Sequence, residues 1–223
     1  MRRGLRSRAW TRRSLAGWAL PLVLLAGCGS ATADPPATAT ATAAYHWTGA
    51  VLVHPVAKPS FTLTDVHGNP FDFQSATAGK VTLLYFGYTH CPDICPENMA
   101  AIAYSLKKLP SDVRSRIAVV FVTTDPARDT PPVLAAWLAS FDSSFIGLTG
   151  NAAEVDLAQF QSKVTMATAQ PAQSNGAYGV DHAAQVIAYS PDNLAHVLFF
   201  QGMPTSAITR DLDRLATHPW TGG

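Results

Sequence analysis

The sequence predicts an α/β domain in which a central mixed sheet is flanked by helices. Two short apolar runs, residues 81–85 and 117–122, lack the polar alternation of a half-exposed strand, and this pattern is typical of strands buried on both faces. Between them, residues 91–109 carry apolar side chains at helical spacing, with Pro96 near the start, where a helix tolerates proline best. Alternation of strands and helices along the chain favours a sheet that is covered on both sides.

A β-hairpin is expected at the N-terminal side of the first buried strand. Residues 61–65 and 71–73 each alternate apolar and polar side chains, and a turn-forming segment at residues 67–70 separates them. The domain is therefore expected to contain an N-terminal β-hairpin.

The C-terminal half is expected to contain three more helices and two more strands. The helices are predicted at residues 131–141, 152–164 and 205–216, and the strands at residues 184–189 and 195–200. Thr130 is the N-cap candidate for the first of these helices, and Gly150 or Asn151 precedes the second.

The N-terminus has the features of an export signal. Residues 1–27 combine six arginines with an apolar run that is too short to span a bilayer comfortably. The run ends in Leu25-Ala26-Gly27-Cys28, which resembles a bacterial lipobox, so we expect residues 1–27 to be a lipoprotein signal peptide and Cys28 to be lipidated. Cleavage without lipidation and an uncleaved anchor are alternatives, and the Sec and twin-arginine export routes both stay open. The protein is then expected on the extracytoplasmic side of the cell membrane, held there by its lipid anchor.

The rest of the chain divides into a tether and a domain. Residues 28–44 are rich in Ala, Thr and Pro and cannot build a core, so we expect a flexible tether before a domain over residues 45–220. Without residues 1–27, the chain has 10 basic and 15 acidic residues, a net charge of about −5. This mildly acidic body argues against nucleic acid as a partner, since nucleic-acid binding needs a basic face.

If Cys28 is lipidated, Cys91 and Cys95 are the two cysteines left for the domain. A lone close pair outside the cytoplasm is a structural disulfide, a redox pair or a metal site. The pair opens a predicted helix, whose N-terminus favours thiolate, and a separation of four residues lets both sulfurs share one helix face. A bridge that closes so short a loop stabilises little. Two thiolates instead suit soft Cu(I) and leave a place for an imidazole.

Several motifs, taken together, resemble the Sco (SenC/PrrC) family. They are YTHCPDICP at residues 88–96, DPARDTP at residues 125–131, FIGLTG at residues 145–150 and VDH at residues 180–182. The resemblance extends over about residues 61–215, and the segments on either side contain none of these motifs.

The resemblance implies a thioredoxin-like fold with a copper site. Copper, as Cu(I) or Cu(II), would be bound by Cys91, Cys95 and His182. In related thioredoxin-like proteins a cis-proline faces the thiols where this chain has His182. The family assists in assembling the copper centres of cytochrome c oxidase.

Other residues near these motifs have less direct roles. Asp93, between the cysteines, either tunes the site by its charge or caps the helix, and we favour the cap. The resemblance implies that Asp125 lies near the site, where it would orient a ligand or act as a weak oxygen donor, although a simple turn residue fits equally well. Arg128 and Asp129 are expected to tie their loop together, and His90 is expected to point away from the metal.

These inferences lead to two main functions. The first is a metallochaperone that passes copper to a copper-containing subunit of a respiratory oxidase, with other copper chaperones as further partners. The second is a thiol–disulfide reductase, an enzyme that keeps the copper-ligating cysteines of the oxidase reduced and whose own Cys91 and Cys95 form a disulfide when oxidised. A copper or redox sensor is a weaker third interpretation. The C-x-x-x-C spacing and His182 favour metal binding over general dithiol exchange.

Overall fold

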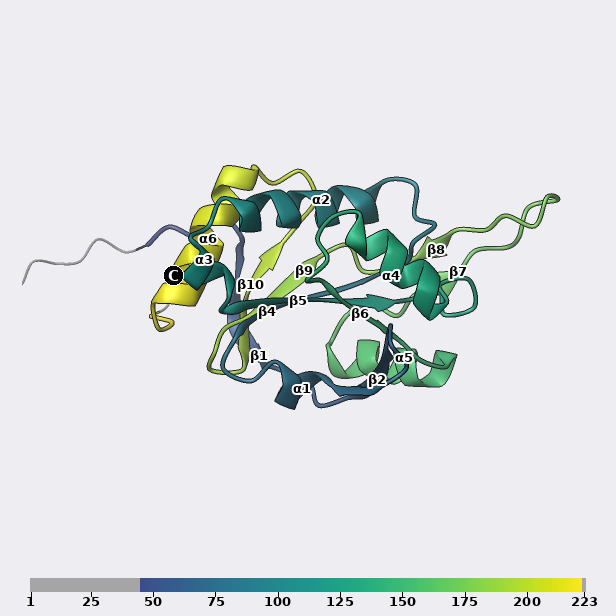
Figure 1. Cartoon of the computed structure of the whole chain (residues 1–223), viewed down its shortest axis with the longest axis horizontal. Helices are drawn as coiled ribbons and strands as arrows, with labels where there is room; N and C mark the ends of the chain where they lie inside the picture. Colours follow the sequence, from purple (N-terminus) through teal and green to yellow (C-terminus); the bar gives the residue numbers. More distant parts are fainter. Residues whose placement is uncertain (1–44, 222–223) are drawn as a thin grey trace, which may run out of the picture. The chain divides into compact units, whose positions relative to one another are not determined.

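An eight-stranded mixed sheet forms the centre of the structure. The computed structural model describes residues 45–221, and Figure 1 shows the sheet crossing the domain with helices on either side. The strand order is β1-β10-β9-β4-β5-β6-β2-β3. The bounds of these strands are β1 Ala50–Ala57, β2 Thr62–Asp65, β3 Pro70–Asp72, β4 Val81–Gly87, β5 Ile117–Thr123, β6 Ile146–Thr149, β9 Val186–Tyr189 and β10 Leu194–Phe199. The helices are α1 Phe73–Ala76, α2 Ile94–Lys107, α3 Ser111–Arg114, α4 Pro131–Ala139, α5 Ala152–Gln161 and α6 Thr205–Thr217.

The middle of the sheet is parallel and its flanks are antiparallel. β5 pairs in the parallel sense with β4 on one side and β6 on the other. β9 runs antiparallel beside β4, and β10 and β1 continue the sheet on that side. At the other edge, β2 pairs antiparallel with β6 and with β3, which confirms the predicted hairpin.

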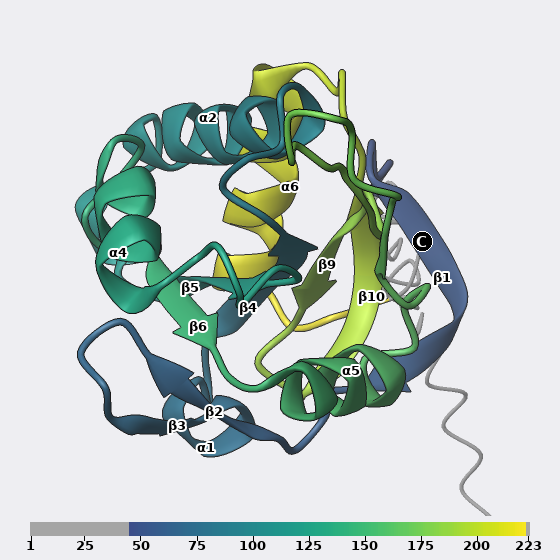
Figure 2. The same cartoon turned by 90° about the vertical axis from the view of Figure 1, so that its right-hand side faces the viewer.

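The central strands are buried on both faces because each face has its own core. Along β4, Leu83 and Tyr85 belong to the core that also contains the buried residues of α2, α4 and α6. Leu84 and Phe86, which alternate with them, belong to a second core with the buried residues of α1 and α5. Figure 2 shows α2, α4 and α6 on one side of the sheet, with α1 and α5 on the other. Burial of both faces explains why polar and apolar residues do not alternate in the sequences of these strands.

Several short or exposed elements have no predicted counterpart in the sequence. β1 is an edge strand with mostly exposed side chains, Pro55 in its middle and an irregular register between Val51 and Val56, so it shows no alternating pattern. β6 has four residues, one of them Gly147, and α1 and α3 also have four each. β7 (Thr168–Ala169) and β8 (Val180–Asp181) pair with each other in a separate two-stranded sheet. Elements this short contain too few residues for a periodic pattern.

The helix that carries the second cysteine begins later than predicted. α2 starts at Ile94, whereas the sequence analysis places the start at Cys91. Pro96 explains the difference, because proline has no N–H and its ring clashes with the carbonyl oxygen four residues earlier inside a helix. A start at Ile94 puts Pro96 in the first turn, where that hydrogen bond is not needed. Cys91 therefore precedes the helix and Cys95 lies in its first turn.

Of the predicted helix caps, Asn151 makes capping hydrogen bonds and Thr130 does not. Asn151 caps α5, since its side chain accepts from the N–H of Glu154 while the carboxylate of Glu154 accepts from the N–H of Asn151. Thr130 occupies the N-cap position of α4, but its side chain makes no capping hydrogen bond. Prolines in the first turn of α4 favour its start instead.

An arm, residues 163–181, leaves the body of the domain between α5 and β9. It contains β7 and β8 and projects from the domain in Figure 1. Side chains 168–177 are exposed, and β8 returns the chain to His182.

No helix within residues 45–221 is long and apolar enough to cross a membrane. The predicted signal peptide at residues 1–27, the lipidation of Cys28 and the tether at residues 28–44 lie outside the described residues. They stay predictions.

Candidate metal centre

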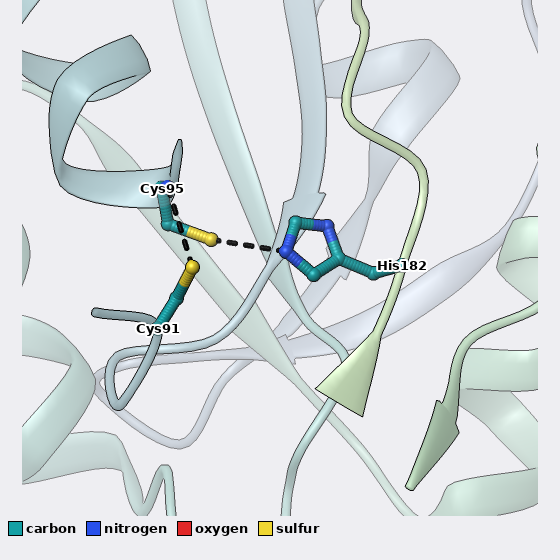
Figure 3. Close-up of side chains that lie close together, drawn as sticks. All are labelled: Cys91, Cys95 and His182. Atoms are coloured by element: carbon teal, nitrogen blue, oxygen red, sulfur yellow. Dashed lines mark hydrogen bonds between the residues drawn. The ribbon is translucent and has the colours of Figure 1, made fainter. Parts of the chain in front are cut away.

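Two cysteines and one histidine from three segments meet beyond the C-terminal end of β4. Cys91 comes from the loop after β4, Cys95 from the first turn of α2 and His182 from the segment after β8 (Figure 3). Their ligand atoms, one Sγ from each cysteine and a ring nitrogen of the histidine, all lie within 4.8 Å of one another. Among residues 45–221, this is the one group of three or more His, Cys, Asp or Glu side chains that could hold a metal ion. The structure therefore brings together the three residues that the sequence selects as ligands.

A backbone hydrogen bond selects the tautomer of His182. Nδ1 lies 2.9 Å from the carbonyl oxygen of Ala183, and because a carbonyl oxygen only accepts, Nδ1 carries the proton. Nε2 then keeps a free lone pair and lies 3.3 Å from Sγ of Cys95. The rings of Tyr85 and Tyr88 approach the imidazole edge-on, with centroids 6.0 and 5.7 Å away. The imidazole is held in the tautomer and orientation that a metal-ligating histidine needs.

Cys95 is the inner thiol of the site. It is fully buried, and the hydroxyl of Tyr85 donates to its Sγ at 3.6 Å. Burial raises the pKa of the Cys95 thiol, and this outweighs the lowering expected from the helix N-terminus. The thiol keeps its proton in the metal-free protein, so a metal ion must displace that proton when it binds.

Cys91 is the outer thiol. It is 8% exposed, whereas Cys95 is 0% exposed, so Cys91 is the more accessible of the two thiols, and His182 is half-buried. Its Sγ accepts a hydrogen bond from the backbone N–H of Cys95 at 3.5 Å. The two sulfurs do not share one helix face, as the spacing suggests, because Cys91 lies outside α2. This hydrogen bond holds Cys91 beside Cys95 instead. Both cysteines are free thiols in the structure, and the disulfide of the oxidised form stays a prediction.

A cleft of about 400 Å³ opens between the loop that carries Cys91 and the arm. Tyr88, His90 and Pro92 line it from the loop, and Tyr178 and Asp181 line it from the arm. The cleft adjoins the loop of the outer thiol through the residues on either side of Cys91.

Asp93 is not the helix cap that the sequence analysis favours. It occupies the N-cap position of α2, but its side chain makes no capping hydrogen bond. Its backbone angles, φ −141° and ψ −79°, lie outside the extended conformation that directs an N-cap side chain toward the first turn. The side chain is exposed, and its carboxylate accepts from Nε2 of Gln201 at 3.5 Å.

Asp125 and His90 also stay outside the group of three. Asp125 is buried, and its carboxylate accepts hydrogen bonds from Arg128 and from the hydroxyl of Tyr178. The ring of His90 pairs through Nδ1 with Thr89, at 3.1 Å from the hydroxyl oxygen. His90 therefore points away from the thiols, as expected.

Two residues of the site, Tyr85 and Gly87, are not among the residues predicted from the sequence. A Cβ at position 87 would lie 2.8 Å from Sγ of Cys95 and 3.1 Å from the ring of Phe121, so glycine leaves the room that the buried sulfur occupies. Alternation along β4 would have found both, since residues 83, 85 and 87 point to the face that α2 covers.

The family of this chain follows from its match to a family model. The SCO1/SenC family model matches residues 52–217. The chain belongs to the SCO1/SenC family. Mitochondrial protein SCO2 of Saccharomyces cerevisiae is 39% identical over 132 residues, which cover 59% of this SCO1/SenC chain and 44% of the yeast protein. The chain thus matches less than half the length of that relative.

Solved SCO1/SenC structures share the fold. Apo Sco1 of Thermus thermophilus superposes with a TM-score of 0.69 at 31% identity, over 78% of this chain and 99% of that one. Bradyrhizobium japonicum ScoI, solved with copper bound, superposes with a TM-score of 0.64 at 32% identity, over 72% of this chain and 99% of that one. These likenesses confirm the predicted thioredoxin-like fold class.

Proposed function

We propose that this SCO1/SenC protein binds a copper ion through Cys91, Cys95 and His182 and delivers it for assembly of the copper centre of cytochrome c oxidase. The observation that carries the proposal is the meeting of two free thiols and a correctly oriented imidazole within 4.8 Å. Copper in the solved structures of B. japonicum ScoI and yeast Sco1 supports the choice of ion. Delivery to the oxidase rests on the family resemblance of the motifs.

The donor set fits copper better than the common alternatives. Two thiolates and an imidazole are soft or borderline donors, which disfavours Mg²⁺ and Ca²⁺. A structural zinc site has four protein ligands, and within residues 45–221 no fourth His, Cys, Asp or Glu joins the group. The chain itself holds Nδ1 of His182 against a carbonyl oxygen, which leaves Nε2 facing the thiols, buries Cys95 and leaves Cys91 as the more exposed of the two thiols.

Copper titration of the purified protein tests the ligand set. The wild-type protein is expected to bind one copper per chain, with sulfur-to-copper charge-transfer bands in the Cu(II) form. Cys91→Ser and Cys95→Ser should abolish tight binding, because a hydroxyl is a hard and mostly protonated ligand. His182→Ala should weaken binding by roughly 100-fold, about 2.8 kcal/mol.

His90→Ala is the matched control, since that neighbouring imidazole lies outside the group. It should bind copper like the wild type. Unchanged copper stoichiometry in either serine variant would refute the ligand assignment.

A second candidate function is a thiol–disulfide reductase that serves the same oxidase. The unequal exposure of the two thiols favours it, because exchange needs one accessible and one resolving cysteine. In this reaction the Cys91 thiolate attacks a disulfide of the partner, breaks its S–S bond, forms a mixed disulfide with one partner sulfur and releases the other as a thiolate, which takes up the proton of the Cys95 thiol. The Cys95 sulfur then attacks Cys91 of the mixed disulfide and displaces the second partner sulfur as a thiolate, so two electrons pass to the partner and Cys91–Cys95 becomes the oxidised pair.

Oxidase activity in cells grown at low copper separates the two functions. His182→Ala removes a metal ligand but leaves both thiols, whereas Cys91→Ser disables either function. If both variants lose oxidase activity and added copper partly restores it for His182→Ala, copper delivery is the essential role. Normal oxidase assembly with His182→Ala, together with failure of Cys91→Ser, would favour the reductase.

The protein is proposed to act at the outer face of the cell membrane, anchored by lipid on Cys28. The Leu-Ala-Gly-Cys sequence after an apolar run supports this anchor. Cys28→Ala should shift the protein from the membrane fraction to the soluble fraction. Retention of that variant in the membrane at normal size would mean that another segment provides the anchor.

A further inference from the structure

We infer that Tyr178 and Arg128 are positioning residues that hold His182 over the two thiols, an inference that rests on the proposed copper site. His182 directly follows the arm, whose side chains 168–177 are exposed. The place of the imidazole therefore depends on where the returning side of the arm is fastened to the body of the domain. Figure 3 shows His182 reaching from this segment toward Cys91 and Cys95.

Tyr178 fastens the arm to the turn that follows β5. Its hydroxyl donates to Oδ1 of Asp125 at 3.0 Å, and its carbonyl oxygen accepts from Nη1 of Arg128 at 3.0 Å. The guanidinium of Arg128 also lies over the Tyr178 ring, 3.5 Å from the ring centroid. Arg128 in turn donates through Nε to Asp125. One residue of the arm thus makes three contacts with a single turn.

The same turn also holds the segment that carries the first cysteine. Asp129 is fully buried, and its carboxylate accepts from the N–H and the hydroxyl of Thr89, at 2.9 and 2.6 Å. The hydroxyl of Thr123, at the end of β5, donates to the same carboxylate at 2.6 Å. Thr89 precedes Cys91 by two residues. Residues 125–129 therefore fasten both the segment of Cys91 and the segment of His182, and so set the separation of the ligands.

Arginine suits this place better than lysine. Nη2 of Arg128 is buried without a hydrogen-bond partner in the described part of the chain, so stacking on the Tyr178 ring compensates for burying this end of the guanidinium. A lysine ammonium provides neither the planar stack nor the paired N–H groups that reach Asp125 and the Tyr178 carbonyl together. Arg128→Lys should therefore release the arm although the charge is kept.

A Tyr178→Ala variant is expected to fold. Val180 stays buried in the core, and the N–H of Ala167 still donates to the side chain of Gln159 at 2.8 Å on the outgoing side of the arm. The change therefore loosens the arm without removing its other anchors. The chain offers a matched control, because Tyr45 forms a similar trio with Asp211, at 2.9 Å, and with Arg214, 5.4 Å from the ring centroid.

The first test is a double-mutant cycle on copper affinity with the purified protein. Tyr178→Ala and Arg128→Lys should each weaken copper binding by roughly 10- to 100-fold, the usual effect of removing a group that orients a ligand. In the His182→Ala background the same changes should have no further effect, because the residues act through the imidazole. Tyr45→Ala should lower stability and leave copper affinity unchanged.

The second test needs no metal. In NMR spectra of the metal-free protein, the His182 ring of the wild type should show one tautomer with the proton on Nδ1, and Tyr178→Ala should mix the tautomers or broaden those signals. The ring signals of His196 should stay the same in both. An equal loss of copper affinity with and without His182, or unchanged His182 signals in Tyr178→Ala, would overturn the inference. A wild-type protein that binds no copper would refute the proposed function instead, and the NMR comparison would still decide whether Tyr178 positions His182.

Discussion

Replacing Gly87 by alanine tests how closely the structure fixes the inner thiol. A Cβ at this position would lie 2.8 Å from Sγ of Cys95, whereas ordinary contacts begin at 3.4 Å, so the sulfur or the strand must move by about 0.6 Å. The sulfur has little space to move, because the hydroxyl of Tyr85 and Nε2 of His182 lie 3.6 and 3.3 Å away. Ligand atoms of a working site are held within about 0.5 Å. We therefore expect Gly87→Ala to weaken copper binding by roughly tenfold or more, about 1.4 kcal/mol, and to cost about 1–3 kcal/mol of stability through overpacking.

Gly147→Ala is the matched control for this experiment. A Cβ at position 147, on β6, would lie 2.6 Å from the side chain of Leu138 and 2.9 Å from that of Val66, so it overpacks the core without touching a thiol. Urea denaturation measures the stability of both variants, and competitive copper titration measures their affinity. Similar destabilisation with a copper defect in Gly87→Ala alone is the expected result. Wild-type affinity in Gly87→Ala, or an equal loss of affinity in both variants, would refute the reasoning.

Three further perturbations test other parts of the structure. Iodoacetamide should alkylate Cys91 roughly tenfold faster than Cys95 in the metal-free protein, because Cys95 is fully buried and kept protonated. Tandem mass spectrometry after short reaction times measures the labelling of each cysteine, and equal labelling would contradict the prediction. Burial lowers the pKa of Lys58 to about 8 from its usual 10.5. Between these values mainly the unfolded chain binds the proton, so raising the pH from 8 to 10.5 should stabilise the wild type by about 2.6 kcal/mol relative to Lys58→Met. A constant difference in the free energy of unfolding between the two proteins would exclude this. Asp211→Ala removes the acceptor of three hydrogen bonds from the first residues of the domain and should lower the free energy of unfolding by about 2–4 kcal/mol. A decrease below about 1 kcal/mol in urea denaturation would show that those donor groups find other partners.

Local pattern is enough to predict those parts of the fold whose burial is visible in the sequence. β4 and β5 are found because both of their faces are buried, which leaves an unbroken apolar run. β1 is not predicted, because most of its side chains face solvent at the edge of the sheet and burial does not require apolar and polar residues to alternate there. The cap expected from Asp93 fails for a different reason, since capping depends on a backbone conformation that the residue type does not determine.

In the site, likewise, residues that share a short motif could be predicted, and residues whose partners are distant in the sequence could not. Cys91 and Cys95 lie in one short motif, and their neighbourhood alone indicates a redox or metal pair. Tyr178 could not be found in this way, because its partners Asp125 and Arg128 lie 53 and 50 residues away and nothing in the local sequence of the arm indicates them. A residue that acts through another residue leaves no pattern of its own in a single sequence.

The pairing of β9 with β4 is what brings His182 to the thiols across 87 residues of chain. Thr82 lies opposite Tyr189 and Leu84 opposite Ile187, so each step toward the C-terminal end of β4 is a step toward the start of β9. The chain that leaves β4 toward Cys91 and the chain that enters β9 from His182 therefore meet at the same edge of the sheet. A shift of one residue in this register would turn the side chains of β9 to the opposite face and place Ile187 in the wrong core, so burial on both faces also fixes the register. The two cores of the sheet thus determine where the third ligand enters, and the turn at residues 125–129 then adjusts its final position.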